Sequence, residues 1–360
     1  RVGPASSSGY IAPEVFTAKG DARSDQYSFA VSLWELLLGR LPFERPGEAS
    51  ALDLGHSAAT LAAPLPLRAQ EAASKLSFVY ATKRYAASDL VSRPLIGRSV
   101  TRLTQPDSFC LEPAISADGK RIAYTLFQGG ASQIWVANID MSNPVCIAGG
   151  HADRNPCWNP AGDAVIYTTF NNGNYDIAMR GLDGSGPVLL TNDSNFDSDP
   201  SVSPDGTTIA FTSNRTGFFR LYLMNMNGQA LRDLLGVDLV ASVYPCFSPD
   251  SKSIAFGGRS SNGTVQLFTV GVDGNGLTQI TPESTRQCSY ASWSPDGRYI
   301  AYVRFERWPN SVGPNQDPAD DKLGGDIMLY DTETKQHTQL TAAEGPMWGP
   351  RPAWLPLKAE

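Results

Sequence analysis

The chain has 360 residues, of which 41% are hydrophobic and only 18% charged, with 33 glycines and 26 prolines. That length allows one large or two modest domains, and the abundance of turn-forming residues favours many short strands over a helical bundle. The net charge of −7, with no basic stripe, argues against a nucleic-acid-binding surface. The strongest apolar run, Phe29–Leu38, is interrupted by Ser32 and Glu35 and is shorter than the about 20 apolar residues of a membrane span. We therefore expect no membrane segment in this chain.

Neither the N-terminal sequence nor the cysteines and histidines indicate the cellular compartment or a cofactor of the protein. The chain begins without Met and in the middle of a motif, as a fragment would, and it shows no signal-peptide pattern. Its five cysteines form no Cys-x-x-Cys pair, and its three histidines stand at no metal-ligand spacing. We predict no metal site and no cofactor, and the redox compartment stays open.

Residues 1–45 carry a motif set that resembles part of a bacterial serine/threonine protein kinase. Residues 9–14 read Gly-Tyr-Ile-Ala-Pro-Glu, and residues 21–29 read Asp-Ala-Arg-Ser-Asp-Gln-Tyr-Ser-Phe. Ser24 suits a helix N-cap, and apolar residues then recur at helical spacing until Gly39. The similarity is to the end of the activation segment and the helix after it. It implies structural roles in a kinase lobe for four residues: Ala12, Pro13, Glu14 and Asp25.

The kinase-like segment lacks the residues that kinase chemistry requires. In that family the Gly-rich loop, the strand lysine and the two catalytic aspartates precede the Ala-Pro-Glu motif, and here only eleven residues precede it. We expect that this chain does not transfer phosphate. Two origins stay open, namely the C-terminal part of an active receptor-type kinase, or a decayed or truncated gene. Residues 46–70, rich in Ala, Pro and Gly, are interpreted as a linker.

An internal repeat with a period of 43 to 46 residues dominates the rest of the chain. A turn of the type Ser-Pro-Asp-Gly recurs five times, with its fourth member at Gly119, Gly162, Gly206, Ser251 and Gly297. Another proline precedes the turn in four copies: Pro113, Pro156, Pro200 and Pro245. A strand-like run follows each turn, as in Ile209–Phe211, and two further runs complete the unit. Four short antiparallel strands per repeat predict a β-propeller blade.

The two ends of the repeat region together predict a sixth blade. Five complete units occupy residues 109–341, and the C-terminus adds only a first-strand copy at Pro352–Pro356. The missing partners stand at the front of the repeat region, as strands at 76–80, 89–92 and 100–104. We therefore expect a mainly β fold with a six-bladed propeller over residues 71–360, closed by the C-terminal strand and preceded by a short α-helical kinase-lobe remnant. The alternative is that residues 71–104 continue the kinase lobe, with Arg93-Pro94 as a late Arg-Pro motif.

The repeat resembles the TolB-like propellers, a WD-like group marked by Ser-Pro-Asp-Gly instead of Trp-Asp. This resemblance covers about 290 residues and implies a six-bladed ring that binds protein partners without catalysis. TolB proteins are periplasmic and carry an α/β domain where this chain has its kinase-like segment, which puts a role in the Tol–Pal system in doubt. The compartment is left open, because kinases of this type work in the cytoplasm.

No catalytic constellation stands out in the repeats. No Gly-x-Ser-x-Gly elbow is present, and the periodic aspartates suit turns. The acidic segment 315–321 does not match a calcium loop and is better interpreted as a solvated insertion. Cys157 and Cys246 share a repeat position that carries small residues elsewhere, so we interpret them as small buried residues of innermost strands.

The remaining prediction is a binding surface. Loops that lead into the innermost strands should surround the mouth of the central channel, where their mixed charge and aromatic character suit a protein or peptide. The candidate residues are Asp153, Arg154, Asn155, Asp197, Asp199, Tyr244, Arg286 and Trp348. Two functions follow: a non-catalytic propeller that binds protein or peptide, or the sensor or scaffold part of a receptor-type kinase.

Overall fold

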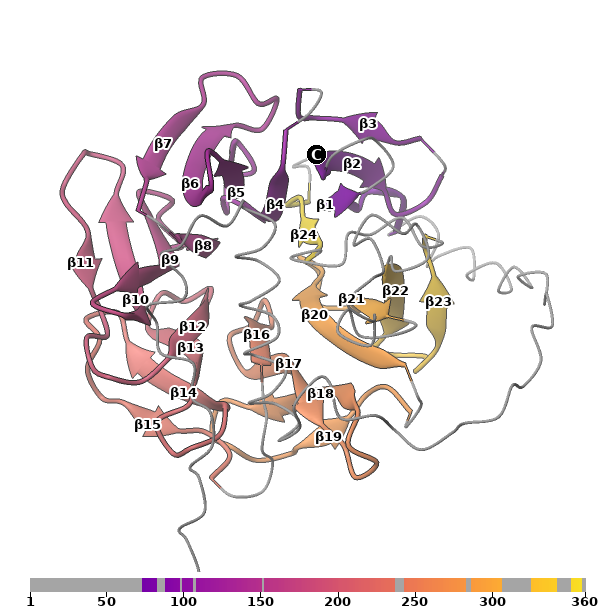
Figure 1. Ribbon diagram of the computed structural model, residues 1–360. Helices are drawn as coiled ribbons and strands as arrows, with labels where there is room; N and C mark the ends of the chain where they lie inside the picture. Colours follow the sequence, from indigo (N-terminus) through magenta and orange to yellow (C-terminus); the bar gives the residue numbers. More distant parts are fainter. Residues whose placement is uncertain are drawn as a thin grey trace, which may run out of the picture.

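The repeats form a ring of six antiparallel sheets, which Figure 1 shows from along the ring axis. The computed structural model describes residues 73–82, 88–97, 99–105, 108–150, 152–236, 243–282, 286–305, 325–341 and 351–357. The kinase-like segment 1–45, the linker 46–70 and the acidic segment 315–321 lie outside these residues. None of the helices in the described part is long and apolar enough to cross a membrane.

Each sheet has four strands, and the first three blades follow the chain without interruption. Blade 1 consists of β4 (Cys110–Ile115), β5 (Arg121–Gln128), β6 (Ala131–Asn138) and β7 (Val145–Ala148). Blade 2 consists of β8 (Arg154–Trp158), β9 (Ala164–Asn171), β10 (Asn174–Gly181) and β11 (Val188–Leu189). Blade 3 consists of β12 (Asp197–Val202), β13 (Thr208–Ser213), β14 (Arg220–Asn225) and β15 (Arg232–Asp233).

The last three blades complete the ring. Blade 4 consists of β16 (Val243–Phe247), β17 (Ser253–Arg259), β18 (Val265–Gly271) and β19 (Thr278–Gln279). Blade 5 consists of β20 (Gln287–Trp293), β21 (Tyr299–Phe305), β22 (Gly325–Asp331) and β23 (His337–Gln339). Blade 6 consists of β24 (Ala353–Trp354), β1 (Ser77–Thr82), β2 (Asp89–Pro94) and β3 (Thr101–Arg102). The first strand of each blade is innermost, and contacts between these inner strands run around the whole ring.

The sixth blade confirms the predicted closure by the C-terminal strand. Residues of β24 pair antiparallel with β1, where Trp354 lies opposite Phe78 and Ala353 opposite Val79. In Figure 1 the yellow β24 accordingly lies beside the indigo β1. The alternative assignment of residues 71–104 to a kinase lobe is wrong, because Arg93 and Pro94 belong to β2. The fourth strand is shorter than predicted, since β3 comprises only two residues.

The recurring turns are held by their own side chains. In the first copy the Ser116 hydroxyl donates to Asp118 Oδ1 over 2.6 Å, and the Lys120 amide donates to the same oxygen over 3.0 Å. These bonds lower the pKa of Asp118. The same serine–aspartate bond recurs in blades 3, 4 and 5. The fourth position is left-handed, with φ of 70° at Gly119 and 61° at Ser251, which explains why glycine dominates there.

The core lies between the blades instead of within one of them. Clusters of buried apolar residues join neighbouring sheets, as where Ile166 and Ile177 of blade 2 pack with Phe211 and Tyr222 of blade 3. The blades also approach each other through backbone. A Cβ added to Gly228, in the hairpin between β14 and β15, would lie 2.3 Å from the carbonyl oxygen of Leu190 in blade 2. The blades therefore stabilise one another, as in other repeat folds.

Candidate functional site

The innermost strands of blades 1 to 5 each contain a β-bulge at one repeat position. The pairing with the second strand shifts there, for example between Ser198 and Ser201 in β12. The first bulged residue is left-handed in every case: Glu112, Asn155, Asp199, Tyr244 and Tyr290, with φ between 54° and 57°. A non-glycine residue in this conformation costs about 1–2 kcal/mol. Such strain tends to be retained where it aims a side chain at a functional site.

These five residues converge on the ring axis together with Arg351, which stands just before β24. We call the six residues the axial ring. Arg351 Nε lies 3.4 Å from the Ala291 carbonyl oxygen of blade 5, and its Nη2 donates to the Pro245 carbonyl oxygen of blade 4. Because Arg351 belongs to blade 6, its side chain reaches past the neighbouring blade to the one beyond. A side chain can span this distance between blades only near the centre of the ring.

Neighbouring members of the axial ring contact one another directly. The Glu112 carboxylate accepts hydrogen bonds from the backbone N–H of Asn155 over 2.7 Å and from its side-chain Nδ2 over 3.2 Å. The Tyr244 and Tyr290 rings stack with centroids 4.1 Å apart, and the Tyr290 hydroxyl donates to the Tyr244 hydroxyl over 3.1 Å. One side of the axis is therefore polar and the other aromatic.

The Asp199 carboxyl titrates near neutral pH. Its side chain is almost completely buried, and burial raises its pKa to about 7 although a hydrogen bond from Ser198 and the charge of Arg351 favour ionisation. The nearby Glu112 carboxylate raises this pKa further. Burial likewise raises the pKa of Tyr244 well above its ordinary value, so its hydroxyl remains protonated. The axis thus contains one carboxyl whose charge changes around pH 7.

Aromatic side chains of blades 2 to 5 lie on the face where the innermost strands begin. We call this side the mouth face. Phe170, Tyr175, Phe196 and Phe219 form a chain with successive centroid distances of 5.1, 4.8 and 5.3 Å. Phe219 continues into a cluster with Tyr244, Tyr290 and Phe305. We call these seven residues the aromatic arc. Phe218, beside this arc, is 47% exposed.

The other charged candidates from the sequence have structural partners. Asp153 is 2% exposed and accepts hydrogen bonds from the Gly150 amide over 2.7 Å and from the Thr169 hydroxyl over 2.6 Å. The Arg154 guanidinium lies 5.5 Å from the centroid of the Tyr175 ring. Asp153 therefore fixes its loop, whereas Arg154 extends the aromatic arc by a cation–π contact.

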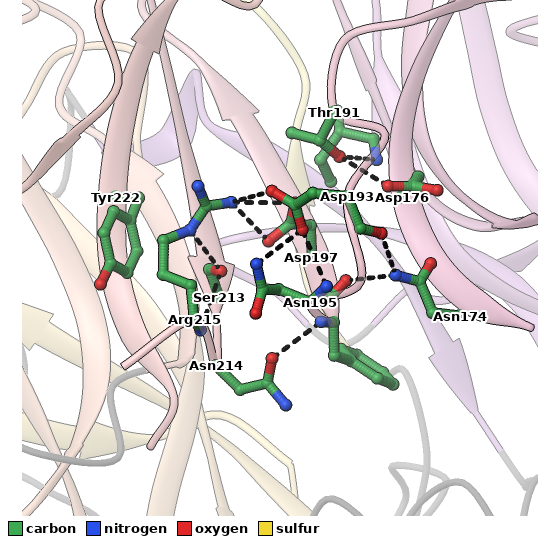
Figure 2. A network of polar contacts seen from close by, with 12 residues as sticks. Asn174, Asp176, Thr191, Asp193, Asn195, Asp197, Ser213, Asn214, Arg215 and Tyr222 are labelled. Carbon is green, nitrogen blue, oxygen red and sulfur yellow. Dashed lines mark hydrogen bonds and ion pairs between the residues drawn. The ribbon is translucent and has the colours of Figure 1, made fainter. Parts of the chain in front are cut away.

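Asp197 belongs to the polar network of Figure 2, which joins blades 2 and 3. Arg215 Nη2 lies 3.0 and 3.1 Å from the two Asp197 carboxylate oxygens and 3.5 Å from Asp193 Oδ2. Asn174 of blade 2 donates to the Asp193 and Asn195 carbonyl oxygens, both over 2.6 Å. Burial raises the pKa of Asp197 to about 6, although the contacts with Ser213 and Arg215 favour its ionised form. The network holds the loop before β12 in place, so Asp197 has its charge partner within the chain.

The axial ring contains three of the eight predicted site residues and three that the sequence analysis missed. Asn155, Asp199 and Tyr244 are the predicted members. Arg286 is half-buried outside the ring, its carbonyl oxygen accepting a hydrogen bond from Gln266 Nε2 over 2.9 Å. Trp348 lies outside the described residues. Three members were missed: Glu112, Tyr290 and Arg351. The sequence could have indicated Glu112 and Arg351, because each directly precedes a proline, as Asn155 does at the same position of its repeat.

Nothing in the described residues assembles a metal site or an activated thiol. The ranges that the structure describes contain no group of three or more His, Cys, Asp or Glu side chains that could hold a metal ion. All five cysteines are free. Cys157 and Cys246 are half-buried, so their interpretation as buried residues was only partly right. Burial raises the pKa of Cys157 to about 12, which keeps it a neutral thiol.

Comparisons with known proteins agree with this architecture. Residues 72–237 match the family model described as PD40, TolB beta propeller domain. A protein TolB homolog of Chlorobium luteolum is 30% identical over 202 residues, which are 56% of this chain and 46% of that protein. A second TolB homolog, of Chlorobium chlorochromatii, is 29% identical over 38% of this chain and 31% of its own length. The chain thus spans less than half the length of these curated relatives.

Solved structures show the same fold. TolB from Acinetobacter baumannii superposes with a TM-score of 0.65 at 21% identity and covers 79% of this chain and 67% of its own. A putative TolB from Agrobacterium tumefaciens has a TM-score of 0.58 at 20% identity and covers 78% of this chain and 97% of its own. The described part of the chain is therefore a six-bladed β-propeller similar to those of TolB proteins.

Proposed function

We propose that this propeller is a non-catalytic binding protein that holds a segment of a protein partner on its mouth face. The observation that carries the proposal is the axial ring itself. Five strained residues and one arginine, with acidic, amide, aromatic and basic side chains, converge from six blades on one axis. Left-handed non-glycine residues are costly and cluster at functional sites, so five of them at one repeat position favour a functional role.

The aromatic arc supports a peptide as the bound species. Protein interfaces are enriched in aromatic residues and arginine, and depleted of lysine and glutamate at their centres. Three residues of the arc, Phe170, Tyr175 and Phe196, are partly exposed and the other four are buried, while the neighbouring Phe218 is exposed. The similarity to TolB propellers, a group that acts through protein contacts, favours the same class of ligand.

Near the axis, neither Cys157 nor Tyr244 is activated as a nucleophile or general base. A nucleophile or general base must be deprotonated when it acts. Burial keeps the Cys157 thiol and the Tyr244 hydroxyl protonated at neutral pH. The Glu112 carboxylate is engaged by Asn155 and by the Thr125 hydroxyl, which donates to it over 2.7 Å. These groups are arranged to present a fixed surface, and the kinase-like segment plays no part in the proposal.

A peptide selection tests this function. A displayed library of random peptides is selected on the full chain, and the recovered peptides are titrated by calorimetry. We expect that Phe218→Ser and Tyr175→Leu weaken binding at least about tenfold, which corresponds to about 1.4 kcal/mol. Val188→Ser, in outer strand β11 and 54% exposed, is the matched control and should bind like the parent chain.

Two results would contradict the proposal. Peptides that bind both mouth-face variants as tightly as the parent would place the binding surface elsewhere. Selection of peptides that lose affinity only with Val188→Ser would place it on the outer edge. Circular dichroism of each variant shows that the ring is folded before binding is compared.

A further inference from the structure

The bulges on two innermost strands leave backbone acceptors available at the axis. In β16 the pairing with β17 shifts between Val243 and Cys246, so Pro245 has no partner residue in the ladder. In β20 the pairing with β21 shifts between Ser289 and Ser292, so Ala291 has none either. Carbonyl groups that a bulge removes from the ladder need another hydrogen-bond donor.

Arg351 supplies that donor for both carbonyl groups. Its Nη2 donates to the Pro245 carbonyl oxygen, and its Nε lies 3.4 Å from the Ala291 carbonyl oxygen. A guanidinium carries five N–H donors in one plane, so it can satisfy acceptors on two different blades at once. An ammonium group is compact and lacks this planar spread of donors.

The charges around these carbonyl groups also favour a cation. The Arg351 charge acts on the Asp199 carboxyl, and the Glu112 carboxylate lies within electrostatic reach of the same carboxyl. Among the described residues, four other titratable groups face this region: Tyr244, which stays protonated, Cys157, which stays a thiol, Tyr290, whose hydroxyl donates to Tyr244, and Cys246, which follows Pro245 in β16. The two carboxyl groups come from blades 1 and 3 and the two carbonyl groups from blades 4 and 5. A positive group at the centre is thus surrounded by acceptors on several sides.

We propose that the axis of the propeller is a binding site for a guanidinium group, which Arg351 of the closing strand fills within the same chain. This site shares Arg351 with the axial ring of the proposed function, but its acceptors are backbone carbonyl groups at the bulges and not the aromatic side chains of the mouth face. Its occupant also holds β24 to the ring. Since β24 pairs with β1 through only two residues, the contacts of Arg351 add a second attachment for the strand. An arginine side chain supplied from outside would fit the same acceptors.

Chemical rescue tests this site. Arg351→Ala should lower the thermal midpoint of the full chain, and low-millimolar ethylguanidinium should restore part of the loss. The same concentration of ethylammonium should restore less, and neither ion should raise the midpoint of the parent chain, where Arg351 occupies the site. Leu357→Ala is the matched control, because Leu357 is 44% exposed and close to the same terminus. Its midpoint should not respond to either ion.

The pH dependence of the rescue provides a second readout. The pKa of Asp199 is about 7 in the parent chain, and loss of the Arg351 charge raises it further, so in the variant this carboxyl gains negative charge above neutral pH. Rescue by ethylguanidinium should therefore be larger at about pH 8 than at about pH 6. In the double variant Arg351→Ala, Asp199→Asn this difference should disappear. If Arg351 contributed only the apolar packing of its side-chain stem, there would be no rescue by the ion and no such pH dependence.

Several outcomes would overturn the proposal. They are the absence of rescue at any concentration below denaturing levels, equal rescue by ethylammonium, and an equal shift of the parent chain. If Arg351→Ala does not accumulate as folded protein, its refolding yield is measured with and without ethylguanidinium, and equal yields also overturn the proposal. The peptide titrations above do not involve Arg351, so failure of either idea can be distinguished from failure of the other.

Discussion

Replacing Trp354 by alanine should destabilise the whole ring, because this residue anchors the closing strand. Its side chain is only 7% exposed and packs on Phe78 with a centroid distance of 5.4 Å. Its indole nitrogen donates to the Ser292 carbonyl oxygen of blade 5 over 3.0 Å. Trp→Ala changes in cores cost about 3–5 kcal/mol, and the carbonyl group left without a partner adds about 1 kcal/mol. Ordinary domains have about 5–15 kcal/mol in total, so the loss is large.

Urea unfolding monitored by far-ultraviolet circular dichroism measures this effect. The unfolding midpoint of Trp354→Ala should fall by an amount that corresponds to about 4–6 kcal/mol. Leu357→Ala is the matched control, since Leu357 is 44% exposed and should change stability by less than about 0.5 kcal/mol. Truncation after residue 350 removes β24 altogether and should be at least as damaging, whereas removal of residues 358–360 leaves β24 in place and should have little effect.

Equal midpoints for Trp354→Ala and Leu357→Ala would refute this reasoning. The same holds if truncation after residue 350 leaves the unfolding curve unchanged. Either result would mean that the C-terminal strand does not close the ring, and that the innermost position of blade 6 contributes no stability.

Three further predictions concern single positions and the N-terminal segment. Gly228→Ala should cost about 1–3 kcal/mol more than Gly184→Ala in urea unfolding, because both glycines have positive φ but only Gly228 abuts the Leu190 carbonyl oxygen. Asp199→Asn should stabilise the chain relative to the parent, by an amount that grows by about 3 kcal/mol between about pH 5 and about pH 8. Because the pKa of Asp199 is raised to about 7 in the folded chain, folding favours the protonated carboxyl, and the stability that this carboxyl contributes is lost as the pH rises through about 7. A flat difference between these pH values would contradict that. Deletion of residues 1–60 should leave a cooperative, β-rich thermal transition, and insoluble protein would show that the segment belongs to the core.

Short-range patterns explain why the number and order of the blades were predictable. The hydrogen bond between Ser116 and Asp118 and the left-handed conformation of Gly119 depend only on residues close together in the chain. The sequence of each repeat therefore predicts its own hairpin. The constant period then fixes how many sheets the chain can form. The pairing of β24 with β1 followed from counting strands, because a ring with an unpaired edge would be unfavourable.

The candidate site was predicted only in part, because its members were chosen from loops and the site lies at bulges. Asp197 was proposed for binding as an expected loop residue, yet it begins β12, and Arg215 from the next hairpin neutralises it. Glu112 stands within a strand, and its left-handed conformation depends on the register shift between β4 and β5. No local pattern in the chain states which residue a bulge leaves unpaired. Pro113, which follows Glu112, is compatible with a bulge at this position but does not require one.

The sequence by itself determined the repeat, the turns, the six-bladed ring and its closure, because those features depend on residues near one another or on a regular period. Only the tertiary structure decided which side chains meet at the axis. Arg351 and Pro245 are separated by 106 positions, yet their atoms hydrogen-bond. Such contacts arise because ring closure places all innermost strands around one line, and the bulges of blades 1 to 5 then turn one residue of each of these five strands toward it. Distance along the chain carries no information about that convergence, whereas the geometry of the closed ring imposes it.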